Sequence, residues 1–90
     1  MVVKLFGSLR LPGVGSRVEV SGGATVAAVL ESLFAQHPQL REHVVQPDRF
    51  ELLPHVNLML NGRLVRDLEG LQTRVAEADS IAIFPPSAGG

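Results

Sequence analysis

The feature that most constrains the fold is one helix-length apolar stripe set between strand-like segments. The stripe is formed by Val26, Val29, Leu30, Leu33, Phe34 and His37, which recur at the spacing of one helix face. Thr25 is a good N-cap before the stripe, and Pro38 disfavours helical backbone after it. A chain of 90 residues supports one domain with one modest core. The helix must therefore bury its apolar stripe against a sheet.

Five segments around this helix carry the apolar or alternating pattern of strands. They are residues 2–8, 16–21, 56–60, 63–66 and 80–84. The first two are separated by a turn rich in glycine and proline, which predicts a hairpin. Asn61-Gly62 separates the third from the fourth, and this pair favours a type I′ turn with positive φ at both positions.

This order of elements predicts an α+β domain in which one main helix packs on one face of a mixed sheet of four to five strands. If the last strand is central and parallel to the first, the topology is the ubiquitin-like β-grasp, which we reach by analogy. We assign residues 1–84 to this domain and residues 85–90 to a flexible C-terminal tail. Residues 44–54 are expected to form an irregular loop, and Leu68, Leu71 and Val75 to anchor the 67–79 segment in the core.

The chain ends on Pro85-Pro86-Ser87-Ala88-Gly89-Gly90, directly after the last predicted strand. Proline stiffens the exit from the strand and prevents further ladder pairing, while Gly89 and Gly90 leave the terminal carboxylate without neighbouring side chains. At about 3.3 Å per residue, this segment would extend roughly 20 Å. Its shape favours insertion into a narrow tunnel of another protein, and the alternative is an ordinary frayed terminus.

Strand alternation also predicts an apolar surface on the side of the sheet away from the helix. If Leu5, Leu58 and Ile83 face the helix, then Phe6, Met59 and Phe84 face the other way. A domain with one helix has nothing of its own to cover that side, so the three side chains would form a docking patch for a partner. The alternatives are a different strand register or coverage of the patch by the 44–55 loop.

Composition excludes several functional classes. The net charge of −1 and the interspersed acids and bases argue against a nucleic-acid-binding protein. No apolar run reaches the length of a membrane span and no signal peptide is visible at Met1, so we expect a cytoplasmic protein that does not bind membranes. The sequence contains no cysteine, and its three histidines lack metal-ligand spacing, so we expect no metal site.

No nucleophile, base and orienting group come together in the pattern, so the chain is a poor candidate for an enzyme with its own active site. Gly13-Val14-Gly15 lacks the third glycine of a nucleotide-binding loop, and a strand follows it where a helix would be required. The acids Asp67, Glu69, Glu77 and Asp79 are expected to be solvated turn residues.

Residues 56–90 resemble the C-terminal half of the small subunit of molybdopterin synthase (the MoaD family), a family of ubiquitin-like β-grasp sulfur carriers. The shared motifs are Asn61-Gly62-Arg63, Leu71-x-Thr73, the acidic turn at Asp79 and the ending Ile83-Phe84-Pro85-Pro86-x-Ala88-Gly89-Gly90. The first half matches more loosely, at Phe6, Ala24-Thr25-Val26 and His37-Pro38. Ser87 stands where the family usually has a small aliphatic residue, and Ala78 where it has glycine.

The resemblance implies a mechanism in which the Gly90 carboxylate is the reactive group. An ATP-using partner of the ubiquitin-activating type would adenylate Gly90, and a sulfur donor would convert it to a thiocarboxylate. Residues 85–89 would enter the molybdopterin synthase large subunit, where the sulfur passes to the molybdopterin precursor of a molybdenum or tungsten cofactor. The chain would bind no cofactor itself, ATP being used by its partner, and would be a non-catalytic, sulfur-carrying subunit.

Three other interpretations stay open at this point. The chain could be a related sulfur carrier for thiamin or tRNA thiolation, or a ubiquitin-like modifier joined to other proteins through Gly90. Lys4, the one lysine of the sequence, and the amino terminus would be its own acceptor groups for chain formation. The third interpretation is an interaction module whose tail has no chemical role.

Overall fold

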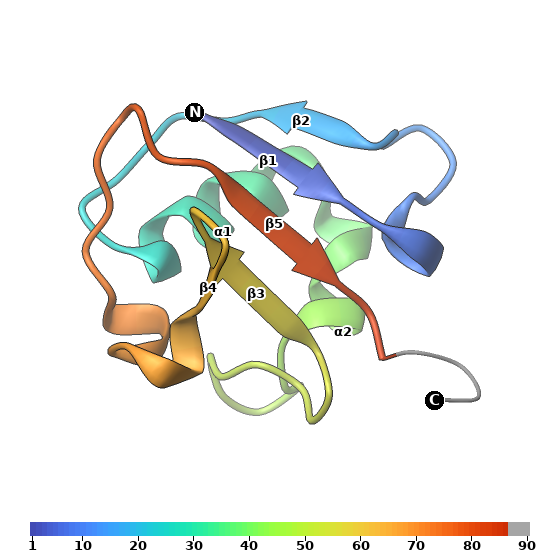
Figure 1. Ribbon diagram of the computed structural model, residues 1–90. Helices are drawn as coiled ribbons and strands as arrows, with labels where there is room; N and C mark the ends of the chain where they lie inside the picture. The colour runs from blue at the N-terminus through green and yellow to red at the C-terminus, as the bar shows by residue number, and fades with distance from the viewer. Residues whose placement is uncertain (87–90) are drawn as a thin grey trace.

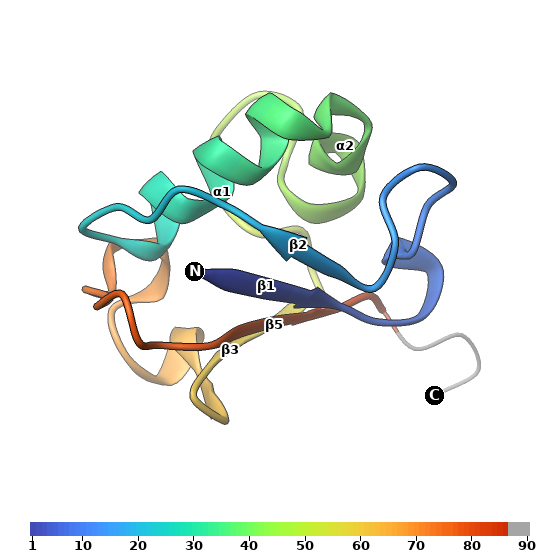
Figure 2. The same cartoon turned by 90° about the horizontal axis from the view of Figure 1, so that it is seen from above.

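The computed structural model describes residues 1–86, and the architecture is one mixed sheet with helices on one side of it (Figures 1 and 2). The sheet has five strands in the order β2-β1-β5-β3-β4. These strands are β1 (Val2–Leu5), β2 (Arg17–Glu19), β3 (Asn57–Leu60), β4 (Arg63–Leu64) and β5 (Ile81–Phe84). Within residues 1–86, no helix has the length and apolarity needed to cross a membrane.

The last strand lies at the centre of the sheet, as the β-grasp topology requires. β5 is parallel to β1, with Val3 opposite Ile81 and Leu5 opposite Ile83, and antiparallel to β3, with Leu58 opposite Ile83. β1 and β2 form the predicted antiparallel hairpin. The predicted ubiquitin-like β-grasp is therefore confirmed, and the strands adjacent in the sheet share one inner face.

The main helix, α1 (Val26–Gln36), forms where the apolar stripe predicts it. The Thr25 hydroxyl accepts a hydrogen bond from the Ala28 amide at 3.2 Å and so caps the first turn. The helix ends before Pro38, which opens a 3₁₀ turn (Pro38–Leu40) that leads into the short helix α2 (Arg41–Val44). Both helices lie on the same side of the sheet (Figure 2).

The core fills the space between this helical layer and the inner face of the sheet. Its fully buried side chains include Val3, Leu5, Leu30, Leu33, Leu58, Ile81 and Ile83. The loop after α2 closes on the helical side, because Phe50 packs edge-on against Phe34 of α1 at a centroid distance of 6.1 Å. At Phe50 the loop packs on the helical side of the sheet, so this contact does not cover the outer face.

The region after β4 differs from the sequence prediction. The return strand ends at Leu64, and Val65–Asp67 is a 3₁₀ turn that places Val65 in the core at 1% exposure. Of the three predicted core anchors, Leu71 and Val75 are half-buried and pack against the core, whereas Leu68 is half-buried outside that group. A 3₁₀ turn changes the direction of successive side chains, so period-two counting fails there.

Thr73 anchors this region together with Leu71 and Val75. Its side chain is buried, donates to the Gly70 carbonyl at 2.7 Å and accepts from the Glu69 amide at 3.0 Å. Its carbonyl accepts a hydrogen bond from the Val26 amide at 3.0 Å. The turn is thereby tied to the first residue of α1.

Asp79 fixes the turn that leads into the central strand. Its carboxylate accepts hydrogen bonds from the Ala76 amide at 2.7 Å and from the side-chain amide of Asn61 at 3.0 Å, and the Asn61 side-chain oxygen accepts from the Ser80 amide. Asn61 and Gly62 both have positive φ, as predicted for the hairpin turn. The Ala76 amide, then Asn61, holds the pKa of Asp79 below its ordinary value of 3.8. Asp79 is thus a solvent-accessible turn acid, as predicted, and its hydrogen bonds to Ala76 and Asn61 were not predicted.

This geometry predicts a pH-dependent role for Asp79 in stability. Because its pKa is lower in the folded state than in the unfolded chain, its contribution is complete well above pH 3.8 and is lost as the pH falls through the folded pKa. We expect Asp79→Asn to unfold at lower urea concentration than the wild type at neutral pH, and the difference to shrink below about pH 4. A difference that stays constant down to pH 2 in paired urea titrations would contradict this role.

Candidate functional site

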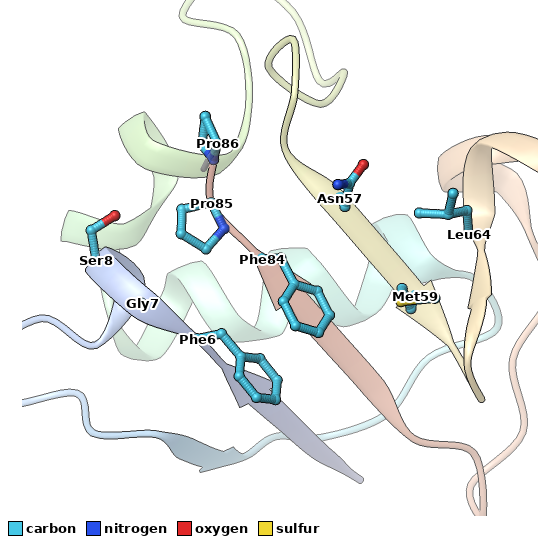
Figure 3. A pocket seen from close by; sticks show the side chains of 9 residues that line it. All are labelled: Phe6, Gly7, Ser8, Asn57, Met59, Leu64, Phe84, Pro85 and Pro86. Carbon is cyan, nitrogen blue, oxygen red and sulfur yellow. The ribbon is translucent and has the colours of Figure 1, made fainter. Parts of the chain in front are cut away.

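The candidate site is the outer face of the sheet, opposite the helices, where Phe6, Met59 and Phe84 come together as the alternation predicts. Phe84 of β5 lies between Phe6, which follows β1, and Met59 of β3 (Figure 3). Phe6 continues the parallel ladder, because its amide donates to the Ile83 carbonyl at 3.2 Å. Each of the three side chains is half-buried, and no large apolar side chain of residues 1–86 is fully exposed.

Phe6 and Phe84 form a preformed aromatic platform. Their rings are nearly parallel, with an interplanar angle of 12° and centroids 4.3 Å apart. The guanidinium carbon of Arg10 lies 5.7 Å from the centroid of the Phe6 ring, and the Arg10 Nε donates to the Leu5 carbonyl at 3.1 Å. These contacts hold the rings in one orientation, so that docking a partner would cost little side-chain entropy.

A hollow of about 770 Å³ opens beside this platform. Its walls come from the end of β1, from β3, from β4 and from the end of β5 (Figure 3). The lining residues are Phe6, Gly7, Ser8, Asn57, Met59, Leu64, Phe84, Pro85 and Pro86. Its lining among residues 1–86 is mainly apolar and includes no titratable side chain, so the hollow suits an apolar side chain of another molecule.

The described part of the predicted tail begins at the edge of this hollow. Pro85 and Pro86 follow directly on Phe84, and both line the hollow. Gly7 makes the approach of Pro85 possible: it has φ of +56°, and a Cβ there would lie 3.1 Å from Pro85 Cγ. The predicted tail residues Ser87, Ala88, Gly89 and Gly90 lie outside the described residues.

Asn57 is a polar residue on this otherwise apolar wall. It stands opposite Phe84 in the β3–β5 ladder, and its side-chain oxygen is buried without a hydrogen-bond donor among the described residues. A buried oxygen without a donor lowers the free energy of unfolding by about 1–3 kcal/mol. The stability of the domain therefore does not explain why Asn57 lies beside the start of the tail. The sequence carried a signal for it, because Asn57 has the same strand parity as Met59.

Other residues of the site were missed for identifiable reasons. The sequence pattern placed Leu64 in a short strand but did not predict which face of the sheet it joins. Its pairing with Met59 brings it to the hollow. Gly7 and Ser8 were counted as strand residues, whereas they open a 3₁₀ turn (Gly7–Leu9) that bends the chain around Pro85. Arg10 contacts Phe6 because of this turn.

Among residues 1–86, no group of three or more histidine or acidic side chains is arranged to hold a metal ion. The lowered pKa of Asp79, in the turn before β5, is explained by hydrogen bonds within that turn. The stacked rings and the mainly apolar hollow beside them give this face the character of a binding surface.

Comparison with known proteins connects this surface to a family. The model of the ThiS family matches residues 3–90. Small archaeal modifier protein 3 of Haloferax volcanii is 41% identical over 71 residues, covering 79% of this chain and 75% of the relative. The sulfur carrier protein CysO of Mycobacterium tuberculosis is 36% identical over 81 residues, covering 88% and 87%.

A solved structure has the same fold over nearly its whole length. The crystal structure of the Amycolatopsis orientalis BexX/CysO complex contains a chain with a TM-score of 0.86 and 29% identity. The alignment covers 99% of the present chain and 98% of the other. The described fold and the matched sequence thus point to the same group of small proteins.

The aromatic platform can be tested by a double-mutant cycle. We expect Phe6→Leu and Phe84→Leu each to lower the free energy of unfolding, and the double variant to lose less than their sum by about 0.5–1.5 kcal/mol, because the stack is lost only once. Urea denaturation of the four proteins measures the coupling. Met59→Leu with Phe6→Leu is the matched control pair. Losses from Phe6 and Phe84 that add within about 0.3 kcal/mol would refute a stabilising stack.

Proposed function

The chain belongs to the ThiS family of ubiquitin-like sulfur carriers and modifiers, and we propose that it carries sulfur as a thiocarboxylate on Gly90. The observation that carries the proposal is the continuity of β5 with the tail. Phe84 belongs to the aromatic platform, and the next two residues, Pro85 and Pro86, line the hollow. A partner seated on the platform would thus receive the tail that starts beside it.

The proposed chemistry explains why the sequence needs no thiol of its own. A carboxylate is a poor acceptor because its leaving group would be oxide. A carboxylate oxygen of Gly90 attacks the α-phosphorus of ATP on an adenylating partner of the ubiquitin-activating type, and pyrophosphate leaves. Hydrosulfide then attacks the acyl carbon, AMP leaves with the bonding pair, and loss of a proton leaves the thiocarboxylate. Gly89 and Gly90 carry no Cβ, so a partner's tunnel could close around the backbone.

In this proposal Phe6, Met59 and Phe84 supply the docking contacts, and Pro85, Pro86, Ser87, Ala88 and Gly89 supply the inserted segment. The catalytic groups belong to the partners. The proposal takes Gly90 as the last residue of the mature protein, which the intact mass of the purified protein checks.

The molybdopterin precursor is the first acceptor that we propose for the sulfur. The support is the ending Ile83-Phe84-Pro85-Pro86-x-Ala88-Gly89-Gly90, which resembles the small subunit of molybdopterin synthase. The relatives reported above are instead named for sulfur carriage and for protein modification. The acceptor therefore has to be tested separately from thiocarboxylate formation.

Protein modification through Gly90 is the second candidate function, and the 41% identity with a small archaeal modifier protein favours it. The same adenylate would then be attacked by a lysine of another protein in place of sulfur. Self-linked chains would have to use Lys4 or the amino terminus. The Met1 amino group already donates to Glu19 Oε2 at 2.8 Å, which leaves Lys4 as the more available amine.

The primary proposal is tested by incubating the purified chain with an adenylating enzyme from the same genome, ATP and sulfide. We expect the intact mass to rise by the difference between one sulfur and one oxygen atom. A variant lacking Gly90 should stay unmodified, and Ser87→Ala is the matched tail control that should react. Unchanged mass of the wild type, or full modification of the variant lacking Gly90, would refute the proposal.

The three outcomes for the activated carboxylate are separable in cells that express a tagged chain. Tagged species of higher mass that disappear with the loss of Gly90 support modification. Loss of molybdopterin on deletion of the gene, restored by the wild type and not by the variant lacking Gly90, supports the molybdopterin acceptor. Thiocarboxylate without either result places the sulfur in another pathway.

A further inference from the structure

A row of cations lies beside the apolar hollow on the same outer face of the sheet. Lys4 of β1 stands directly opposite Arg17 of β2 in the antiparallel ladder. Residues opposite one another in a ladder share a face, and the pairing of Lys4 with Ala82 places that face next to Phe84. Both side chains are exposed. Arg10, over the Phe6 ring, extends the row toward the hollow. We call Lys4, Arg10 and Arg17 the cationic flank.

The Lys4–Arg17 pair is unfavourable for the isolated domain. Directly opposite residues in an antiparallel pair have Cβ atoms about 4.5–5.5 Å apart, and like charges at that separation destabilise the sheet. An opposite-charge pair at the same two positions would stabilise it. Folding therefore gives no reason for two cations at these positions.

The nearest acid on the same strand does not neutralise them. Glu19 shares the parity of Arg17, but its carboxylate binds the Met1 ammonium at 2.8 Å. Lys4, Arg10 and Arg17 form no ion pair with any residue in the 1–86 range. The positive charge of the flank is thus available to another molecule, although the net charge of the whole chain is −1.

We propose that the cationic flank selects the adenylating partner, through a surface that presents an apolar side chain to the hollow and carboxylates to Lys4 and Arg17. This inference rests on the proposed function. Two observations support a protein occupant: the flank is continuous with a mainly apolar hollow, and the net charge is slightly negative. A nucleic acid binds best to a continuous basic surface, and an apolar hollow beside the cations would contribute nothing to such binding.

The two parts of the face then have different tasks. The hollow and the Phe6–Phe84 platform supply contact area, which governs how slowly the complex separates. The flank lies at the rim, where charges mainly raise the association rate and reject wrong partners. An acidic rim on the adenylating enzyme would orient the domain so that the tail starting at Pro85 meets the active site.

The test is the association rate of the chain with the purified adenylating enzyme, measured by stopped flow in about 50 and 300 mM NaCl. We expect Arg17→Glu to slow association about tenfold at the lower salt and by less than about threefold at the higher salt. Lys4→Glu should behave in the same way. Phe84→Leu should instead speed dissociation about equally at both salt concentrations.

The control is Arg74→Glu, which makes the same change in charge at an exposed arginine beside Thr25, at the start of α1. It should leave both rates within about twofold of the wild type. The thermal midpoint of Arg17→Glu should not fall, because the variant replaces a like-charge pair by an opposite-charge pair. A lower affinity together with unchanged stability separates a docking role from a structural one.

Several results would overturn the inference while leaving the sulfur-carrier function intact. The inference is contradicted if thiocarboxylate forms and Arg17→Glu associates at the rate of the wild type. It is also contradicted if Arg74→Glu slows association as much as Arg17→Glu does. Salt-sensitive binding of the wild type to a single-stranded oligonucleotide, lost in Arg17→Glu, would assign the flank to nucleic acid. If no thiocarboxylate forms with any variant, the proposed function itself fails.

Discussion

The alternation of side chains across β1, β5 and β3 is the constraint on which the structure depends. One set of alternate residues, including Leu5, Leu58 and Ile83, is buried under the helices. The other set must then point to the opposite side, where neither α1 nor α2 packs. Because one helical layer covers only one of the two faces, Phe6, Met59 and Phe84 remain partly exposed to solvent. Phe6 and Phe84 limit their exposure by stacking on one another.

The central position of β5 joins that face to the tail. β5 pairs with β1 on one side and β3 on the other, so its register is fixed from both edges. Asn61, Asp79 and Ser80 fix the point at which it begins, and Pro85 marks the point at which it ends. A rigid strand therefore leads directly to the segment that carries the proposed chemistry, and movement within the domain is not needed to present it.

Sequence reasoning was successful where one periodicity holds over several residues. The α1 stripe, its Thr25 cap, the Asn61-Gly62 turn and the outer position of Phe6, Met59 and Phe84 all follow from spacing and local chemistry. It failed where 3₁₀ turns interrupt a strand pattern, at Gly7 and Ser8 and at Val65. The cationic flank was missed because it depends on the Lys4–Arg17 register, which the hairpin loop sets and alternation alone does not.

The most direct measurement is nuclear magnetic resonance of the isotope-labelled chain titrated with its adenylating enzyme and ATP. If the outer face and the tail form one docking unit, the amide signals of Phe6, Met59 and Phe84 should shift or broaden together with those of Gly89 and Gly90. The signals of Leu30 and Leu33 in α1 should change far less. Perturbations concentrated on α1 and α2, with the Phe84 signal unchanged, would contradict the assignment of this face.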